Sequence, residues 1–205
     1  HGAWSQSSLS YHGKYYQVDE LIVQPKPVSS RGRPHPVLYA GGESDAAKSL
    51  ITRACDAYVM HGDPPDRVAL KVADMQRRRE SAGQAPMRYG MAAYAIVRDT
   101  EVEAQRELER ITNVQPGSPG FDNYQDWIAN TQLDQHLSLQ DYSVSNRGLR
   151  AGLVGTPEQV ADRVREFEAA GVGLLLLQCS PQLEEMERFA EQVMPLVRAR
   201  NVLAA

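Results

Sequence analysis

The sequence lacks the features that mark several large classes of protein. It has only two cysteines among 205 residues, Cys55 and Cys179, and each lies beside or within an apolar run. We therefore expect two free thiols instead of a disulfide framework. The sequence also has no apolar stretch of roughly 18 residues, the length that a membrane-spanning helix needs. These absences favour a cytoplasmic protein that depends neither on a membrane nor on disulfides.

Charge and motif content argue against further functions. The formal net charge is −4, which gives no sign of a nucleic-acid surface. The one basic run, Arg77–Arg79, falls at the end of a predicted helix, where we expect a solvated face favoured by the helix dipole. The five histidines show no metal-ligand spacing. Neither a Gly-x-Ser-x-Gly elbow nor a dinucleotide-binding fingerprint is present.

The first 36 residues have the composition of a hairpin followed by a linker. Tyr11–Val18 and Leu21–Val23 are typical of a small β-hairpin. The prolines that punctuate the linker are Pro25, Pro27, Pro34 and Pro36. We expect one domain over residues 1–205, with this hairpin and linker as its first part.

From residue 37 onward, short apolar strands alternate with amphipathic helices. The expected strands are Val37–Ala40, Ala54–Met60, Tyr89–Arg98 and Leu174–Leu177. The expected helices are Asp45–Arg53, Asp66–Ala82, one begun by the capping box Thr100–Glu103, one between Thr156 and Gly171, and Leu183–Val197. Residues 113–152 interrupt this alternation. A connection of that length in a compact domain is more often functional than idle, so we interpret it as a lid.

The alternation predicts an α/β fold with parallel strands and right-handed crossovers. A doubly wound open sheet fits the order, as does a β/α barrel. The chain opens on His1-Gly2-Ala3-Trp4 without an initiator Met, and its strand–helix units make up about half of an eightfold barrel. We therefore predict the C-terminal part of a (β/α)8 TIM barrel, entered partway, with the lid insertion before its last β/α unit.

One candidate binding site is the turn Gly41-Gly42-Glu43-Ser44, which follows a predicted strand. Ligands of α/β folds bind at the carboxyl ends of the strands. Two glycines let the backbone approach a ligand closely, and the start of the helix after Ser44 would suit a phosphate. A plain tight turn explains the same residues equally well, so both interpretations stay open.

Three further residues lie where chemistry could occur. His61 follows a strand and could polarise an oxygen, although a turn histidine satisfied by a neighbour is an alternative. Tyr94 lies in a strand whose Ala92 and Ala93 are small and could leave room for a ring. Alternatively, Tyr94 fills the interior of the barrel. Arg147 lies in the loop Asn146–Arg150 and could close over an anion, or it is a solvated charge.

Several segments together resemble the bacterial luciferase-like flavin monooxygenases, and among these the alkanesulfonate and dimethyl sulfone monooxygenases. These segments are Leu38–Ser44 (LYAGGES), Tyr58–Pro65 (YVMHGDPP), Arg147-Gly148 with Leu153–Pro157 (LVGTP), and Pro181–Glu185 (PQLEE). The hairpin residues His12–Tyr16 match as well. The resemblance covers essentially the whole chain and corresponds to the C-terminal part of that barrel.

The resemblance implies a two-component system. A separate NAD(P)H-dependent FMN reductase would supply reduced FMN, which the monooxygenase would use with O₂ to cleave a C–S bond of a small organosulfur compound. Gly41–Ser44 would then belong to the FMN phosphate site, and Arg147, Tyr94 and His61 would be the catalytic candidates. The resemblance also implies a homo-oligomer, either a dimer or a tetramer.

The sequence departs from the alkanesulfonate enzymes on one strand. Where those enzymes place an Arg and a His, this chain has Ala92 and Tyr94. A buried sulfonate needs charge-assisted donors, whereas a neutral sulfone needs only hydrogen-bond donors. The resemblance therefore favours dimethyl sulfone, converted to methanesulfinate and formaldehyde, over alkanesulfonates such as methanesulfonate.

Two other functions stay open at this point. A deazaflavin-dependent hydride-transfer enzyme could use the same barrel. Alternatively, the chain could be a non-catalytic partial barrel, whose unpaired sheet edges would promote self-association.

Overall fold

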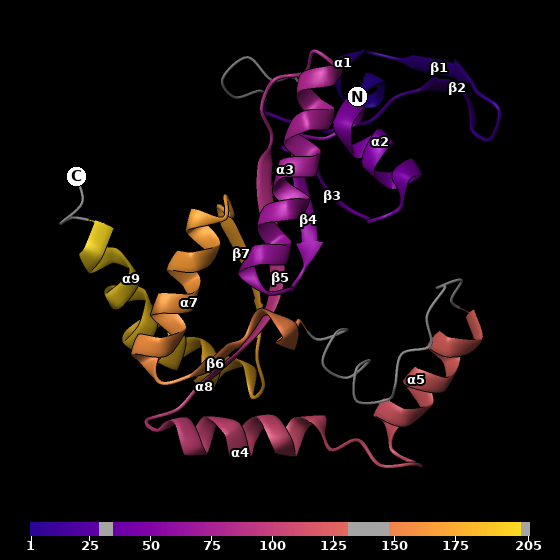
Figure 1. The fold of residues 1–205 in the computed structure, drawn as a ribbon. Coiled ribbons are helices and arrows are strands. Elements are labelled where there is room, and N and C mark those ends of the chain that lie inside the picture. Colours follow the sequence, from indigo (N-terminus) through magenta and orange to yellow (C-terminus); the bar gives the residue numbers. More distant parts are fainter. Residues whose placement is uncertain (29–34, 131–147, 202–205) are drawn as a thin grey trace. The chain divides into compact units, whose positions relative to one another are not determined.

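The computed structural model describes residues 1–28, 35–130 and 148–201 (Figure 1). Contacts between residues divide the chain into two compact units, His1–Tyr39 and Ala40–Ala205. The two units are described separately. The expectation of one domain over residues 1–205 stays a prediction.

The first unit contains the predicted β-hairpin. Its elements are α1 (Gly2–Ser5), β1 (Leu9–His12) and β2 (Gln17–Leu21). The two strands pair antiparallel, with Tyr11 opposite Val18. Across the pair, Nε2 of His12 lies 3.0 Å from a carboxylate oxygen of Asp19. The hairpin is therefore confirmed, although β1 starts earlier than the sequence analysis expected.

The second unit alternates strands and helices along the chain. Its strands are β3 (Tyr39–Gly41), β4 (Ala57–His61), β5 (Arg88–Val97), β6 (Leu153–Gly155) and β7 (Leu174–Gln178). Its helices are α2 (Asp45–Ala54), α3 (Pro65–Ser81), α4 (Glu101–Thr112), α5 (Pro119–Asn130), α7 (Pro157–Ala169), α8 (Gln182–Arg188) and α9 (Met194–Asn201). A 3₁₀ turn, η1 (Leu149–Ala151), precedes β6, and a π-helical turn, η2 (Phe189–Val193), joins α8 to α9.

The sheet is built around β5, the longest strand. Strand β4 pairs parallel with its first half, from Ala57 opposite Arg88 to His61 opposite Ala92. Strand β7 pairs parallel with β5 from Gly90 to Tyr94. The sheet follows the chain order from β3 through β4 to β5, and both β6 and β7 pair with β5. The strand order of a doubly wound sheet would reverse partway, so this order is that of a barrel segment.

The sequence analysis missed strand β6, which lies directly after the long insertion. Leu153 to Gly155 pair with Ala95 to Val97 at the end of β5. The main chain before β6 is held as well, because the N–H of Tyr94 donates to the carbonyl of Gly148 at 3.2 Å. Three residues are too few for a periodic pattern to reveal. The insertion therefore precedes a short strand and α7, and β7 and α8 follow these.

The insertion contains a helix, and one local expectation needs correction. Residues 119–130 of the insertion form helix α5. Its first residue is Pro119, and proline is compatible with the first turn of a helix. Arg79 was expected to be solvated but is only 8% exposed. Its guanidinium donates to the carbonyl oxygens of Thr52 and Cys55 at 2.6 and 3.3 Å, where α2 ends.

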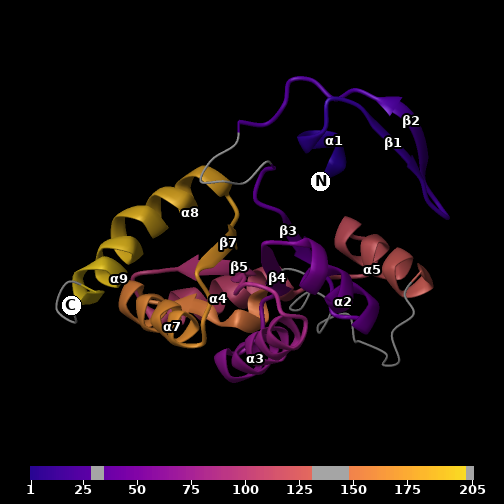
Figure 2. The ribbon, with the colours of Figure 1, turned by 90° about the horizontal axis from the view of Figure 1, so that it is seen from above.

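The sheet of the second unit has two different faces. The helix face carries Tyr58 and Met91, which pack in the main core with side chains of α3 and α7. Figure 2 shows α2, α3 and α7 along this side of the strands. The open face carries His61, Ala92 and Leu176, which occupy paired positions on β4, β5 and β7 and so point the same way. His61 is exposed, and Leu176 is 46% exposed.

Further along β5, α4 covers the same side as the open face. Tyr94 and Ile96 form a second core cluster there with Ala104 of α4 and Leu149 of η1. The capping box that starts α4 is formed as predicted, since the Thr100 hydroxyl accepts from the N–H of Glu103. None of the helices in the described ranges combines the length and the apolar character that a membrane crossing needs.

Candidate functional site

The turn between β3 and α2 has the geometry of an anion-binding corner. Gly42 has φ +149°, and a Cβ there would lie 2.6 Å from the Cβ of Ala47. The hydroxyl of Ser44 caps α2 by accepting from the N–H of Ala47 at 3.2 Å. Helix geometry leaves the N–H groups of Asp45 and Ala46 without an intrahelical acceptor. These groups and the positive end of the helix dipole could hold a phosphate.

Glu43, the acidic residue of this corner, belongs to a chain of ion pairs that we call the corner network. The corner network consists of Glu43, Asp63, Lys71 and Arg150. Nζ of Lys71 lies 2.5 Å from Glu43 Oε1 and 2.6 Å from Asp63 Oδ2. Nε of Arg150 lies 3.3 Å from Asp63 Oδ1. The carboxylate of Glu43 is thus paired with Lys71.

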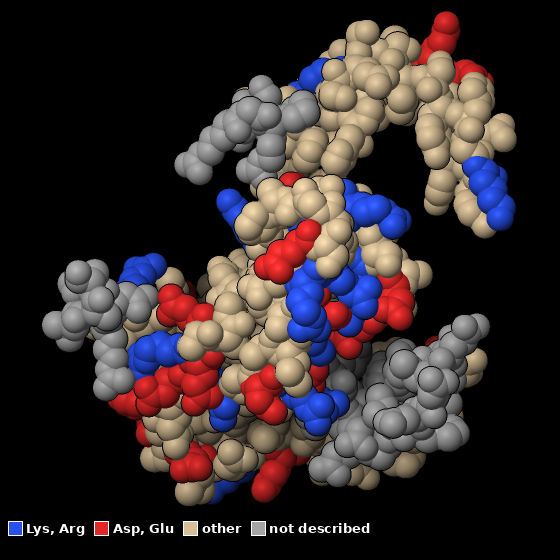
Figure 3. Space-filling model, turned by 45° about the horizontal axis from the view of Figure 1, so that its top comes forward, with Lys and Arg blue, Asp and Glu red and all other residues tan. Residues whose placement is uncertain are grey.

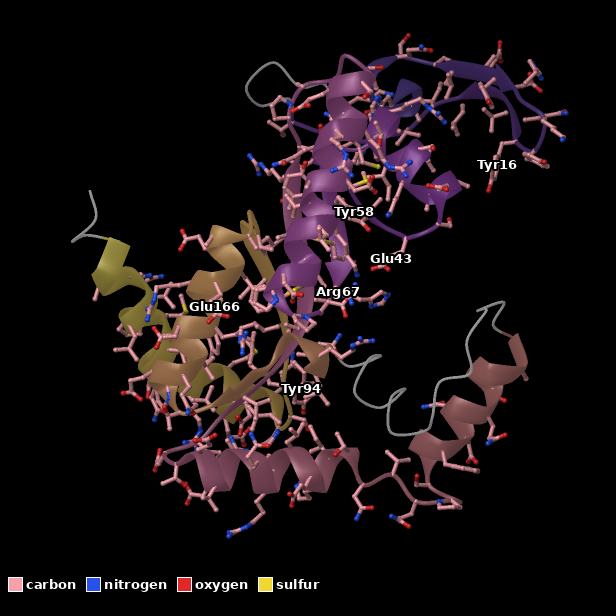
Figure 4. The ribbon with its side chains drawn as sticks, in the orientation of Figure 1. Tyr16, Glu43, Tyr58, Arg67, Tyr94 and Glu166 are labelled. Carbon is pink, nitrogen blue, oxygen red and sulfur yellow. The ribbon has the colours of Figure 1, made fainter. Side chains whose placement is uncertain are left out.

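The corner network holds Lys71 in its charged form. Burial alone would lower the pKa of Lys71, but hydrogen bonds and charges from Asp63 and Glu43 outweigh burial and raise this pKa. Figure 4 shows Glu43 projecting from the turn after β3. On the face seen in Figure 3, basic and acidic side chains are interspersed over the second unit. With two cations and two carboxylates, the corner network is neutral at pH 7.

His61 and Tyr94 lie on the same side of the sheet but in different surroundings. His61 ends β4 opposite Ala92 and is exposed. Tyr94 lies two residues beyond Ala92 and is only 7% exposed, because Leu149 and Ala104 pack around it. Figure 4 shows Tyr94 between β5 and α4. The structure therefore supports barrel filling as one role of Tyr94, and it leaves His61 accessible.

Arg147 lies outside the described residues, and so does much of the expected lid. Gly148 has φ +76°, and a Cβ there would lie 2.9 Å from the Cα of Ala93 and from the carbonyl oxygen of Ala92. Gly62, which follows His61, has the same kind of contact with Ala92 and Gly148. The chain that follows Arg147 therefore lies against the end of β4 and the middle of β5.

Sequence reasoning missed the cations of the corner network. Asp63 lies in the HGDPP turn that was singled out, but Lys71 is eight residues further on and Arg150 follows the insertion. One local signal was available. Pro64 and Pro65 fix the start of α3, which places Lys71 in its second turn on the side that faces back to the strand ends.

A cavity of about 550 Å³ lies on the other side of the sheet from His61. It is lined mainly by apolar side chains, among them Leu175, Leu177, Phe189, Met194 and Val197. Its one acidic side chain, Glu185, is bound by Arg98 at 2.9 Å. Within the described ranges, no three His, Cys, Asp or Glu side chains gather as a metal site would require. The corner at β3 is therefore the stronger candidate for a polar ligand.

Parallel strands placed in chain order, with ligand-type turns at their carboxyl ends, define part of a β/α-barrel protein. A comparison of the chain with models of known protein families identifies its family. Residues 1–173 match the model of the luciferase-like monooxygenase family, and the chain belongs to this family.

The chain is similar to relatives and solved structures that are about twice as long. It is 32% identical to an FMNH₂-dependent dimethylsulfone monooxygenase of Pseudomonas putida, and the match covers 96% of this chain and 55% of the relative. The structure of DmoA from Hyphomicrobium sulfonivorans matches with a TM-score of 0.72 at 17% identity, over 97% of this chain and 48% of DmoA. The structure of the long-chain alkane monooxygenase LadA matches with a TM-score of 0.72 at 20% identity, over 95% of this chain and 47% of LadA. The chain thus spans about half the length of these proteins.

Proposed function

We propose that this chain carries part of the flavin and substrate site of a two-component monooxygenase that uses reduced FMN and O₂. The single observation that carries this proposal is the anion-binding corner at Gly42 and Ser44, at the carboxyl end of a strand in a luciferase-like barrel segment. The relative from Pseudomonas putida, whose name specifies FMNH₂, supports this cofactor over a deazaflavin.

The residues of the corner fit a flavin phosphate. The absence of a Cβ at Gly42 removes the atom that would otherwise fill the turn beside Ala47. The N–H groups at the start of α2 and the Ser44 hydroxyl would bind the phosphate oxygens. The role of Glu43 is through its main chain, since its carboxylate would repel a phosphate. When bound, reduced FMN supplies the electrons that activate O₂.

The open face of the sheet provides a surface for the flat part of the flavin. On this face Gly90 has no side chain and Ala92 has only a methyl group. His61 at its rim is a hydrogen-bond donor to the ring or to a substrate oxygen. Tyr94, with Leu149 packed on it, closes the end of the site and helps to exclude water. Arg147, a candidate from its loop position and from the resemblance, stays a prediction, as does the lid.

We propose dimethyl sulfone as the substrate, with methanesulfinate and formaldehyde as products. The described strand β5 offers no cation on the open face near Ala92 and Tyr94, where a sulfonate would need one. A separate NAD(P)H-dependent reductase would supply the reduced FMN, and the enzyme would act as a homo-oligomer. The name of the relative from Pseudomonas putida agrees with this substrate.

A substrate panel with purified full-length enzyme tests the proposal. With reduced FMN supplied by a reductase, we expect kcat/KM for dimethyl sulfone to exceed that for methanesulfonate by at least about tenfold. Formaldehyde reports turnover of either substrate. Methanesulfinate is the second product expected from dimethyl sulfone, and sulfite is the one expected from methanesulfonate. Faster turnover of methanesulfonate would reverse the substrate assignment. Tighter binding of a reduced deazaflavin than of reduced FMN would favour hydride transfer instead.

A further inference from the structure

The corner network joins side chains from four parts of the second unit. Glu43 comes from the turn after β3, Asp63 from the loop after β4, and Arg150 from η1. Lys71 of α3 lies between the two carboxylates. The side chains of Lys71 and Asp63 are each only 18% exposed, so their attraction is screened less than that of a surface pair.

Lys71 also determines the charge beside the anion-binding corner. Three carboxylates flank the corner: Glu43, Asp45 and Asp63. Asp45 is paired with Arg78 at 2.7 Å, and Asp63 has Arg150 in addition to Lys71. For Glu43, Lys71 is the cation in contact among the described residues. Without Lys71, a negative charge would remain uncompensated beside the place where a phosphate would bind.

We propose that Lys71 is a positioning residue whose charge makes the Gly42–Ser44 corner acceptable to an anionic phosphate. It does so by neutralising Glu43 and by holding the turn after β3 against the loop after β4. This inference rests on the proposed function, because the phosphate it concerns is that of FMN. Lys71 acts through Glu43 and Asp63, and it is not itself a phosphate ligand.

A second lysine provides a matched control on the same pair of helices. Nζ of Lys48 in α2 lies 3.0 Å from Asp74 in α3, and the two side chains are 19% and 25% exposed. This pair resembles that of Lys71 in chemistry and burial. The Lys48–Asp74 pair does not include any residue of the corner. Arg78 also lies 3.2 Å from Asp74, so Asp74 keeps a cationic partner in a Lys48 variant.

The experiment compares the binding of FMN and riboflavin to the full-length enzyme by flavin fluorescence. The two ligands differ only in the phosphate, so their affinity ratio isolates its recognition. We expect Lys71→Met to lower the affinity for FMN by about tenfold or more and that for riboflavin by less than about twofold. Lys71→Arg should retain the FMN preference, and Lys48→Met should leave both affinities unchanged.

A double variant separates charge from folding. If the loss in Lys71→Met comes from the uncompensated carboxylate, then adding Glu43→Gln should restore most of the FMN preference. An equal loss of FMN and riboflavin affinity in Lys71→Met, without recovery in the double variant, would overturn the inference. Unchanged FMN affinity in Lys71→Met would overturn it too. If the wild-type enzyme binds riboflavin as tightly as FMN, the phosphate site of the proposed function fails first.

Discussion

The two faces of the sheet in the second unit differ in how they are stabilised. On the helix face, Tyr58 and Met91 are fully buried by helices of the same unit. On the open face, the paired row His61, Ala92 and Leu176 leaves Leu176 46% exposed. Helices of this unit cover Tyr58 and Met91, although a cavity of about 550 Å³ remains on that side beside Leu175 and Leu177. The open face carries the candidate residues His61 and Tyr94.

The two faces differ in whether their side chains pack in the core or stay accessible to water. Leu176 lies on β7, which pairs with β5 alone among the described strands. It keeps nearly half of its exposure although it belongs to a run of four leucines. Leu176 therefore contributes little to the core of this unit. Predictions for the two faces differ accordingly.

The largest expected effect comes from truncating the same residue type on each face. Leu153 of β6 is fully buried in the main core. We expect Leu153→Ala to lower the free energy of unfolding by about 2–5 kcal/mol, because it leaves a cavity. Leu176→Ala should lower it by less than about 1 kcal/mol. Urea titration of the chain measures both values. Equal costs would show that the open face is packed as tightly as the helix face.

A smaller effect is expected from a new cation on the open face. Ala92→Arg would place a guanidinium beside His61, where a sulfonate oxygen could accept from it. We expect the ratio of kcat/KM for methanesulfonate to that for dimethyl sulfone to rise by about tenfold. Ala92→Gln, similar in shape but uncharged, is the control and should leave the ratio nearly unchanged. No change in Ala92→Arg would mean that substrate does not reach this row.

Local signals in the sequence were sufficient for the backbone of the site. Ser44, Thr100 and Thr156 act as the predicted N-caps, because a cap depends only on residues within one turn. The parallel order of the strands followed from alternation and the handedness of crossovers. The turn at Gly42 and the Ser44 cap were therefore predicted from the sequence, together with the strand that leads to them; the binding role of this turn stays a prediction.

The sequence did not reveal contacts between residues that are distant along the chain. Arg79 looked like a solvated charge because the carbonyl groups it binds belong to α2, more than twenty residues earlier. Lys71 looked like an ordinary helix residue for the same reason. Strand β6 was missed because its three residues become a strand only beside the end of β5. Each of these errors concerns a contact between distant segments, which local patterns do not encode.

The smallest expected effect concerns a polar atom on the helix face. Tyr58 is fully buried, and its hydroxyl has no hydrogen-bond partner among the described residues. An unpaired buried hydroxyl costs free energy, so Tyr58→Phe should leave stability at pH 7 unchanged or raise it by about 1 kcal/mol. Urea unfolding at pH 7 measures this change. A clear loss of stability would indicate that the hydroxyl has a partner and that the helix face is more than apolar packing.

The pH dependence of the same variant provides an independent check. Burial raises the pKa of Tyr58 from its ordinary value of 10 to about 12, and the charges of Glu43 and Asp74 add to the effect. Between these pH values the unfolded chain loses the phenol proton while the folded chain keeps it. The free energy of unfolding should therefore fall as the pH rises through this range. In Tyr58→Phe this contribution is absent, so its stability should fall less steeply than that of the wild type between pH 10 and pH 12. Parallel pH profiles for the two proteins would show that Tyr58 titrates as it does in water, and that the helix face is more open than its burial indicates.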